Sequence, residues 1–389
     1  METFDAAETT ILDRLRRRLS DIMAVERVEV RQEPDRVIAF YGRLYDTPEV
    51  AFDRASERFE DLGYTAMFAQ VDPEEDAYQV VAVQGVRRPK SSRRWLNAVL
   101  LVATILATMV AGLSPEADLS DPLWYLSGLP FAAALMAILL AHELAHYFVA
   151  RRYGSPVSLP YFVPMPLSPF GTMGAVILQR APMRDRRALF DIGIAGPLAG
   201  LVVAIPLLIL GLAFSQVGRP SEFVDIQEGL AVTQEGNSLA YVAAKYLVFG
   251  RILPSEGGED VWLSLPASPG GPVAFAAWAG LLVTAINLLP IGQLDGGHVA
   301  YALLGKRAWK LAYVTIALLG ALGLYLAAIG NLAAGTWIVW ALLGLLLGPR
   351  HPPPLNDATR LGRGRVLLGV LLALILIATF VPMPLIPAR

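Results

Sequence analysis

The segment LLAHELAHYF, residues 139–148, places two histidines and a glutamate inside a long apolar run. His142 and His146 are four residues apart, so on an α-helix they project from one face and can bind a single metal ion. Glu143 lies directly beside the first histidine. The pattern His-Glu-x-x-His is typical of zinc metalloproteases, in which the glutamate is the general base. Because ionisable groups are costly in hydrocarbon, their presence here indicates a functional site.

Two other interpretations of this motif remain open from the residues alone. The histidines could form hydrogen bonds between helices, or they could belong to a proton path in a transporter. The metal interpretation also has a requirement of its own. A catalytic zinc ion takes three protein ligands and a water, so a third ligand must come from elsewhere in the chain.

The third ligand has few possible sources, because the chain contains no cysteine and four histidines. Intramembrane carboxylates and His298 remain. Asp295 lies near the end of the apolar run 272–303, at the depth expected for the two motif histidines. Asp191 follows the basic run MRDRR, where a carboxylate is explained as a first-turn residue that complements the helix dipole. We therefore expect Asp295 rather than Asp191 to be the ligand.

The segments HELAH and NLLPIGQLDG together resemble the site-2 protease family of intramembrane zinc metalloproteases. The second motif of that family reads Asn-x-x-Pro-x-x-x-x-Asp-Gly. Every fixed position is matched here, by Asn287, Pro290, Asp295 and Gly296. The resemblance covers about residues 95–305 and implies a zinc metalloendopeptidase that hydrolyses peptide bonds within transmembrane segments of membrane protein substrates.

The resemblance also implies roles for individual residues. One zinc ion per chain is expected on His142, His146 and Asp295, with Glu143 as the general base. Asn287 is expected near the substrate, where it could donate a hydrogen bond to an oxyanion or to the substrate backbone. It could instead serve as a hydrogen-bonding residue between helices.

The order of the segments is similar to that of archaeal and plastid members of the family. The soluble domain precedes the membrane part, and no PDZ-like insertion is evident between the third and fourth apolar runs. A metal-dependent or proton-coupled membrane transporter is the alternative function, and a catalytically silent membrane scaffold is a third. Glutamine in place of Glu143 would separate them, because a transporter has no peptidase activity to lose.

The composition predicts an α-helical polytopic membrane protein. Hydrophobic residues make up 55% of the 389 residues and charged residues 17%, well below the usual share in soluble domains. The net charge of −2 gives no reason to expect a nucleic-acid partner, so the expected partners are the lipid bilayer and a transmembrane protein substrate. Apolar runs near the ~20 residues that a spanning helix needs predict about seven transmembrane helices. These runs are residues 95–113, 128–150, 188–214, 272–303, 309–329, 332–348 and 366–382.

The orientation follows from the lysine and arginine residues. Basic clusters lie before the first and third apolar runs, after the second and fourth runs, and between the sixth and seventh runs. If each run crosses the membrane once, all of these clusters lie on the same side of the membrane. We predict an integral protein of the cell membrane with its N-terminal domain in the cytoplasm and its C-terminus outside. The polar N-terminus is unlike a secretory signal, so the first apolar run is expected to direct insertion.

Residues 1–85 are predicted to form a separate soluble α+β domain. Helical and alternating patterns follow one another in the order α-β-β-α-β-β. A basic linker, residues 86–94, leads to the polytopic membrane domain of residues 95–389. The N-terminal domain could regulate the enzyme or gate its substrates, or it could be a stabilising cap or an assembly surface.

Residues 155–182 are apolar but contain five prolines between Pro156 and Pro169, which excludes a regular helix. Irregular backbone at membrane depth is tolerated where protein buries it or where it lines a cavity. We therefore predict a re-entrant hairpin, and the strand-like segment GTMGAVILQ could pair with an unwound substrate. A loop on the membrane surface without substrate contact is the alternative, and a similar hairpin in the family favours the first interpretation.

Overall fold

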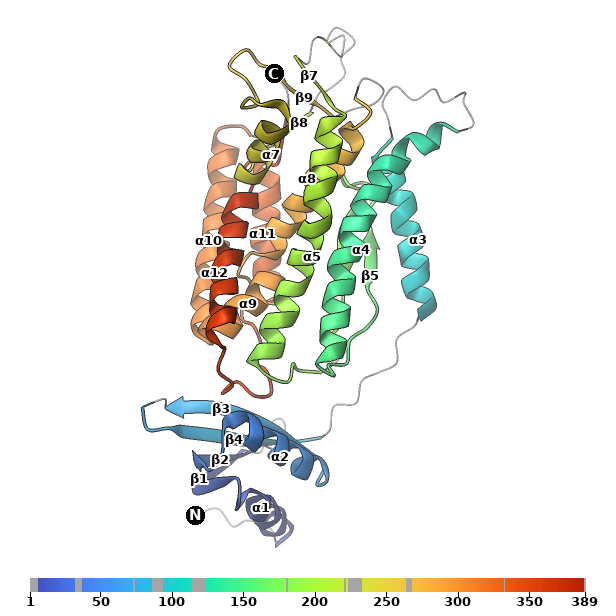
Figure 1. Cartoon of the computed structure of the whole chain (residues 1–389). Coiled ribbons are helices and arrows are strands. Elements are labelled where there is room, and N and C mark those ends of the chain that lie inside the picture. The colour runs from blue at the N-terminus through green and yellow to red at the C-terminus, as the bar shows by residue number, and fades with distance from the viewer. Residues whose placement is uncertain are drawn as a thin grey trace.

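The structure is a computed structural model of the chain. It describes residues 6–31, 37–72, 74–85, 94–113, 120, 123–179, 181–219, 222, 233–263, 268–331 and 333–387. A small α+β domain from the N-terminal part of the chain lies at one end of a bundle of helices (Figure 1). Residues 86–93 of the predicted linker lie outside the described residues.

The N-terminal domain has its helices and strands in the predicted order. They are α1 (Ala6–Leu19), β1 (Met23–Arg31), β2 (Val37–Leu44), α2 (Pro48–Glu60), β3 (Tyr64–Asp72) and β4 (Ala77–Gln84). The strands form an antiparallel sheet in the order β1-β2-β4-β3, and alternate side chains of β4 are buried. Leu15 of α1 and Phe59 of α2 pack on Phe40 and Val80 of this sheet, which gives the domain its own hydrophobic core.

The rest of the described chain is mainly helical, with short strand pairs. Its elements are α3 (Arg94–Ala111), η1 (Trp124–Gly128), α4 (Leu129–Arg152), β5 (Tyr161–Pro164), β6 (Thr172–Val176), α5 (Arg186–Ala213), β7 (Gln216–Gly218), β8 (Thr233–Glu235), α7 (Leu239–Phe249), β9 (Asp260–Trp262), α8 (Gly271–Asn287), α9 (Asp295–Leu304), α10 (Arg307–Ala328), α11 (Ala334–Leu346), α12 (Arg363–Thr379) and β10 (Leu385–Pro387). The short strands pair as β5-β6, β7-β9 and β8-β10.

Within the described residues, four helical segments are long and apolar enough to cross a membrane. They are α3, η1 with α4, α5 and α10. The run 272–303 is not one continuous helix, because the helix is interrupted between α8 and α9. Of the remaining apolar runs, 332–348 forms the 13-residue α11 and 366–382 the 17-residue α12.

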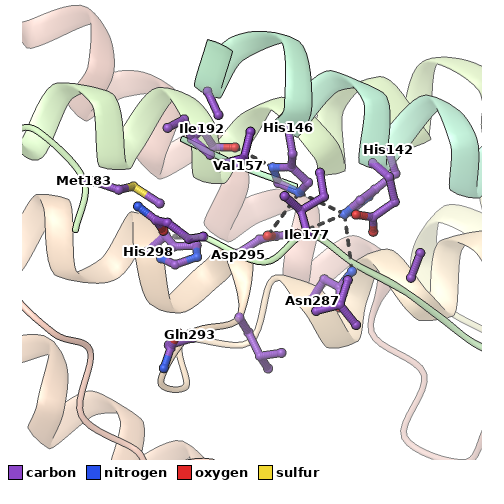
Figure 2. A pocket seen from close by; sticks show the side chains of 16 residues that line it. His142, His146, Val157, Ile177, Met183, Ile192, Asn287, Gln293, Asp295 and His298 are labelled. Carbon is purple, nitrogen blue, oxygen red and sulfur yellow. Dashed lines mark hydrogen bonds and ion pairs between the residues drawn. The ribbon is translucent and has the colours of Figure 1, made fainter. Parts of the chain in front are cut away.

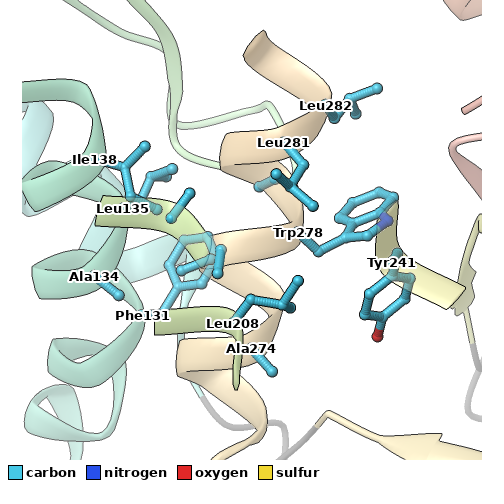
Figure 3. Packing of buried hydrophobic residues seen from close by; sticks show 14 of the residues in the cluster. Phe131, Ala134, Leu135, Ile138, Leu208, Tyr241, Ala274, Trp278, Leu281 and Leu282 are labelled. Atoms are coloured by element: carbon cyan, nitrogen blue, oxygen red, sulfur yellow. The ribbon is translucent and has the colours of Figure 1, made fainter. Parts of the chain in front are cut away.

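The packing of α4, α5 and α8 forms the centre of the bundle (Figure 3). Phe131 of α4 stacks on Phe275 of α8, with 5.6 Å between ring centroids, and Leu135 and Ile138 of α4 belong to the same buried cluster as Leu208 of α5. Trp278 of α8 lies toward Tyr241 of α7. Small residues permit the close approach of these helices: a Cβ atom at Gly280 of α8 would lie 2.9 Å from the Ile138 side chain. Small residues at helix contacts are the usual means of tight packing in membrane bundles.

The two ends of the bundle differ. The ends of α4 and α9 and the starts of α5, α10 and α12, where the basic residues cluster, face the N-terminal domain. At the opposite end lie α7, the β7-β9 and β8-β10 pairs and the C-terminal part of the chain (Figure 1). Buried Lys245 of α7 is paired there with Asp260, with 2.7 Å between Nζ and Oδ1.

The N-terminal domain docks on the bundle through backbone pairing. The outer edge of β3 pairs with residues 355–357, which lie between α11 and α12: the Phe68 amide donates to the Leu355 carbonyl at 2.7 Å. The same segment pairs on its other side with residues 183–185, where the backbone N–H of Asn356 donates to the Arg184 carbonyl at 2.8 Å. Arg184 also forms an ion pair with Asp53 of α2 at 2.6 Å.

Candidate active site

The residues of the His-Glu-x-x-His motif are buried on α4, and Asp295 of α9 meets the two histidines (Figure 2). Nε2 of His142 lies 3.1 Å from Oδ2 of Asp295, and Nε2 of His146 lies 3.2 Å from Oδ1. The two Nε2 atoms are 3.1 Å apart. The structure thus brings Asp295 to the two histidines, from which the sequence separates it by about 150 positions.

The break between α8 and α9 explains why Asp295 reaches the histidines. Asn287 is the last residue of α8 and Asp295 the first residue of α9, so residues 288–294 form a short non-helical segment between them. Glycine is required directly after this segment: a Cβ atom at Gly296 would lie 1.9 Å from the Leu288 carbonyl oxygen. Asn287 thereby also faces the site, with its Nδ2 atom 3.4 Å from Nε2 of His142.

Glycines of α5 form the wall behind the histidines. A Cβ atom at Gly196 would lie 2.1 Å from Nε2 of His146, and one at Gly200 would lie 3.4 Å from Nδ1 of His142. Residues four positions apart on a helix lie on the same face, so Gly196 and Gly200 both face α4. Neither glycine was predicted from the sequence, although their spacing in the segment DIGIAGPLAG was a signal that could have identified them.

The donor atoms fit a zinc ion. Nδ1 of His146 lies 2.7 Å from the Ile192 carbonyl oxygen, so Nδ1 carries the proton and Nε2 presents its lone pair to the site. Oδ2 of Asp295 is buried and makes no hydrogen bond to any described residue, although Nε2 of His142 is 3.1 Å away. This geometry is expected of atoms that face a common cation. Tetrahedral zinc separates its nitrogen and oxygen ligands by roughly 3.3 Å, close to the distances found here.

Asp191 does not belong to the site, and the reason expected for its position is wrong. The residue that caps α5 is Asp185, whose side chain accepts a hydrogen bond from the Ala188 amide at 2.8 Å. Asp191 lies further along the helix and is held by Arg365 of α12, with two hydrogen bonds of 2.7 Å. This ion pair accounts for the carboxylate without a metal.

The site opens into a cavity of about 160 Å³. Its walls include Glu143, Asn287 and His298, and one side is formed by residues 175–177 at the end of β6. This strand belongs to the predicted hairpin: β5 and β6 pair antiparallel, with Phe162 opposite Ala175. The volume holds an ion and a few waters, so a peptide must enter along the open side.

His298 was considered from the sequence only as a possible third ligand, and the structure gives it a partner that no sequence motif indicated. Nδ1 of His298 lies 2.6 Å from Nε2 of His351, a residue between α11 and α12. The two histidines are 53 positions apart. Their contact depends on the packing of the last part of the chain against α9.

The site can be compared with known proteins. Residues 130–327 match the sequence profile of peptidase family M50. The chain is similar to "Probable zinc metalloprotease EGY2, chloroplastic" of Arabidopsis thaliana, at 31% identity over 368 residues, which cover 91% of this chain and 62% of the relative. The protein of the same name from Oryza sativa subsp. indica is 30% identical over 362 residues, with 88% and 62% covered.

A second plant relative, "Probable zinc metalloprotease EGY1, chloroplastic" of Arabidopsis thaliana, is 31% identical over 254 residues. The match covers 64% of this chain and 42% of that relative. The chain therefore spans less than two thirds of the length of the curated relatives it matches.

Proposed function

Because the chain belongs to peptidase family M50, the family of the site-2 proteases, we propose that it is an intramembrane zinc metalloprotease. Its reaction is the hydrolysis of peptide bonds within transmembrane segments of membrane proteins. The observation that carries the proposal is the convergence of His142 and His146 with Asp295, since both family motifs contribute to one buried set of donor atoms. The relatives are named as metalloproteases, which supports a protease rather than the transporter.

Zinc is the metal in the names of these relatives, and two imidazole nitrogens with a carboxylate are a donor set that zinc accepts. We place one ion per chain on His142, His146 and Asp295. Bound there, zinc supplies a Lewis acid and lowers the pKa of a water molecule toward neutrality.

The remaining chemistry belongs to side chains of the protein. Glu143, next to His142 on α4, accepts the proton of the attacking water and delivers it to the leaving amine. Asn287 donates a hydrogen bond from Nδ2 to the substrate carbonyl oxygen or backbone. The burial of the site keeps bulk water away and strengthens both interactions.

The substrate is proposed to bind as an extended strand along the hairpin. A helix must unwind before its peptide bonds can be attacked, and lipid offers no partners for the freed backbone groups. Residues 175–177 line the cavity, so the edge of β6 is suitably placed to supply these partners. The hairpin is then re-entrant and lies at membrane depth.

The same proposal includes seven membrane spans and a cytoplasmic N-terminal domain. The broken pair α8 and α9 counts as one crossing, and α11 and α12 as two further ones. The basic helix ends gather near the N-terminal domain, which favours the cytoplasm for that end. The cell membrane as the location, and the division into a domain of residues 1–85, a linker of residues 86–94 and a membrane domain of residues 95–389, stay predictions.

The proposal is tested on the purified full chain by zinc analysis and by cleavage of a model transmembrane substrate. We expect about one zinc per chain and a substrate cut that disappears in Glu143→Gln while zinc remains bound. A chain that binds zinc but never cuts would favour the transporter.

The choice of the third ligand has a matched control. Asp295→Asn should lower both zinc content and cleavage sharply, because the amide is a weaker ligand than the carboxylate. Asp191→Asn should keep both, since that residue binds Arg365 instead. The reverse pattern would overturn the ligand assignment.

A further inference from the structure

His298 faces the cavity of the proposed active site. It follows Asp295 by three positions on α9, so both side chains emerge from one face of the helix. Figure 2 shows His298 on one side of Asp295 and Asn287 on the other. The side chain is half-buried and lines the same cavity as Glu143, whereas its Nδ1 atom is occupied by His351. Nε2 is therefore the nitrogen that His298 can offer to a ligand.

His351 is a fixed support for this ring. Its side chain is buried, and its backbone carbonyl accepts a hydrogen bond from Nε1 of Trp309 at 3.0 Å. The ring of Tyr301 lies against it, with 5.1 Å between centroids. Burial, followed by repulsion from His298, lowers the pKa of His351 to about 3, so the ring is neutral at neutral pH and carries one N–H.

The position of that proton follows from the hydrogen bonds. Nδ1 of His351 is buried and has no hydrogen-bond partner among the described residues, so a proton there would be an unsatisfied donor, which is rarer in proteins than an unsatisfied acceptor. The proton is thus best placed on Nε2, where it is donated to Nδ1 of His298 at 2.6 Å. A neutral His298 that accepts at Nδ1 must carry its own proton on Nε2.

We propose that His298 is a further catalytic residue, which donates a hydrogen bond from Nε2 to the substrate carbonyl oxygen as negative charge develops on it. The proposal rests on the protease function proposed above. In this step a water oxygen bonds to the carbonyl carbon, the water proton passes to Glu143, and the carbonyl π electrons become a lone pair on oxygen. His298 keeps its proton throughout. His351 is a positioning residue that fixes the tautomer and orientation of His298.

Two substitutions distinguish a catalytic role of His298 from a purely structural contact with His351. His298→Gln retains an N–H donor near the position of Nε2 but loses the atom that meets His351. His298→Asn keeps a polar atom near the position of Nδ1 but is too short to place a donor at the position of Nε2. Removal of an oxyanion donor typically lowers kcat by about 100-fold or more, so we expect that loss in His298→Asn and a much smaller loss in His298→Gln. KM and zinc content should stay close to the wild-type values in both.

His351 is tested in the same way. His351→Leu should lower kcat without a change in KM, and His351→Gln, which can still donate to His298, should restore much of the loss. The proposal would be overturned if His298→Asn were as active as His298→Gln or more active. Loss of zinc from His298→Asn, or full activity in both His298 variants, would also overturn it. Wild-type protein that fails to cut any substrate would instead contradict the protease function itself.

Discussion

At the scale of single residues, the metal centre depends on glycine as much as on its ligands. The helix α5 passes so close to α4 that hydrogen is the largest side chain tolerated behind His146. Gly196 leaves room for this imidazole and for its hydrogen bond to the Ile192 carbonyl. An interaction that fixes the outer nitrogen of a ligand histidine commonly contributes tenfold or more to metal affinity.

Gly196→Ala should therefore lower zinc affinity by about tenfold or more, because the new methyl group would displace the His146 ring. Gly200→Ala is the matched control on the same face of α5, where the nearest atom would be 3.4 Å away. Zinc content is measured after dialysis against graded chelator concentrations. Equal affinity in the two variants would show that α5 does not hold the histidines in place.

At the scale of elements, the break between α8 and α9 and the β5-β6 hairpin determine where the site lies along the axis of the bundle. His146 lies five residues before Arg151 at the basic end of α4, which at 1.5 Å per residue is about 7.5 Å along the helix axis. The metal centre is therefore nearer to the end of the bundle that faces the N-terminal domain. Under the proposed function, a substrate helix would unwind at that depth.

Cleavage should occur in the half of the substrate's membrane segment nearest the N-terminal domain of the enzyme. Replacement of Gly, Pro or Asn residues in that half by Leu should slow the cut, because Leu favours the helix. Fragment masses from a model substrate give the position, and time courses at matched expression give the rate. A cut in the other half, or a rate indifferent to the Leu replacements, would contradict the unwinding step.

At the scale of the whole molecule, the N-terminal domain is joined to the catalytic bundle by a continuous set of backbone pairs. Residues 355–357 pair with β3 on one side and with residues 183–185 on the other, and Met183 lines the cavity. The side chain of Asn356 also donates a hydrogen bond to the Pro48 carbonyl at 3.0 Å. A change in docking of the domain would therefore be transmitted to a wall of the site.

Asn356→Ala should loosen this docking by about 1 kcal/mol, or about fivefold in the docking equilibrium, because it removes a buried hydrogen bond. The Phe68 amide reports docking directly in hydrogen exchange, since it donates to Leu355 across the interface. It should exchange faster in the variant. Arg54→Ala, which removes an ion pair with Asp46 inside the domain, should leave this exchange rate unchanged. Unchanged exchange in Asn356→Ala would contradict the docking contact.

The orientation of the whole molecule can be tested by cysteine labelling, because the chain has no native cysteine. Lys306 and Glu256 are both exposed; Lys306 directly precedes α10 and Glu256 lies between α7 and β9. The start of α10 and the α7–β9 region are at opposite ends of the bundle (Figure 1). With an impermeant reagent on intact cells, Glu256→Cys should react and Lys306→Cys should react only after the cells are opened. The opposite result would invert the proposed topology.

The sequence by itself predicted the chemistry proposed for this protein, because helical spacing places His142 and His146 on one face and ionisable residues in a membrane segment indicate a functional site. It also predicted the element order of the N-terminal domain, because amphipathic periods are local properties. Pro290 and Gly292 mark the break between α8 and α9 locally, but only the tertiary structure shows that this break brings Asp295 to the histidines.

Tertiary structure also decided which polar groups meet. The pair of Asp191 with Arg365, the contact of His298 with His351 and the glycine wall of α5 depend on helices distant in the sequence. Hydrophobic and charge patterns show that a residue is buried or exposed, but not which element covers it. Packing between helices determines which element covers a residue, because this packing depends on side-chain shapes across the whole bundle rather than on neighbours in the chain.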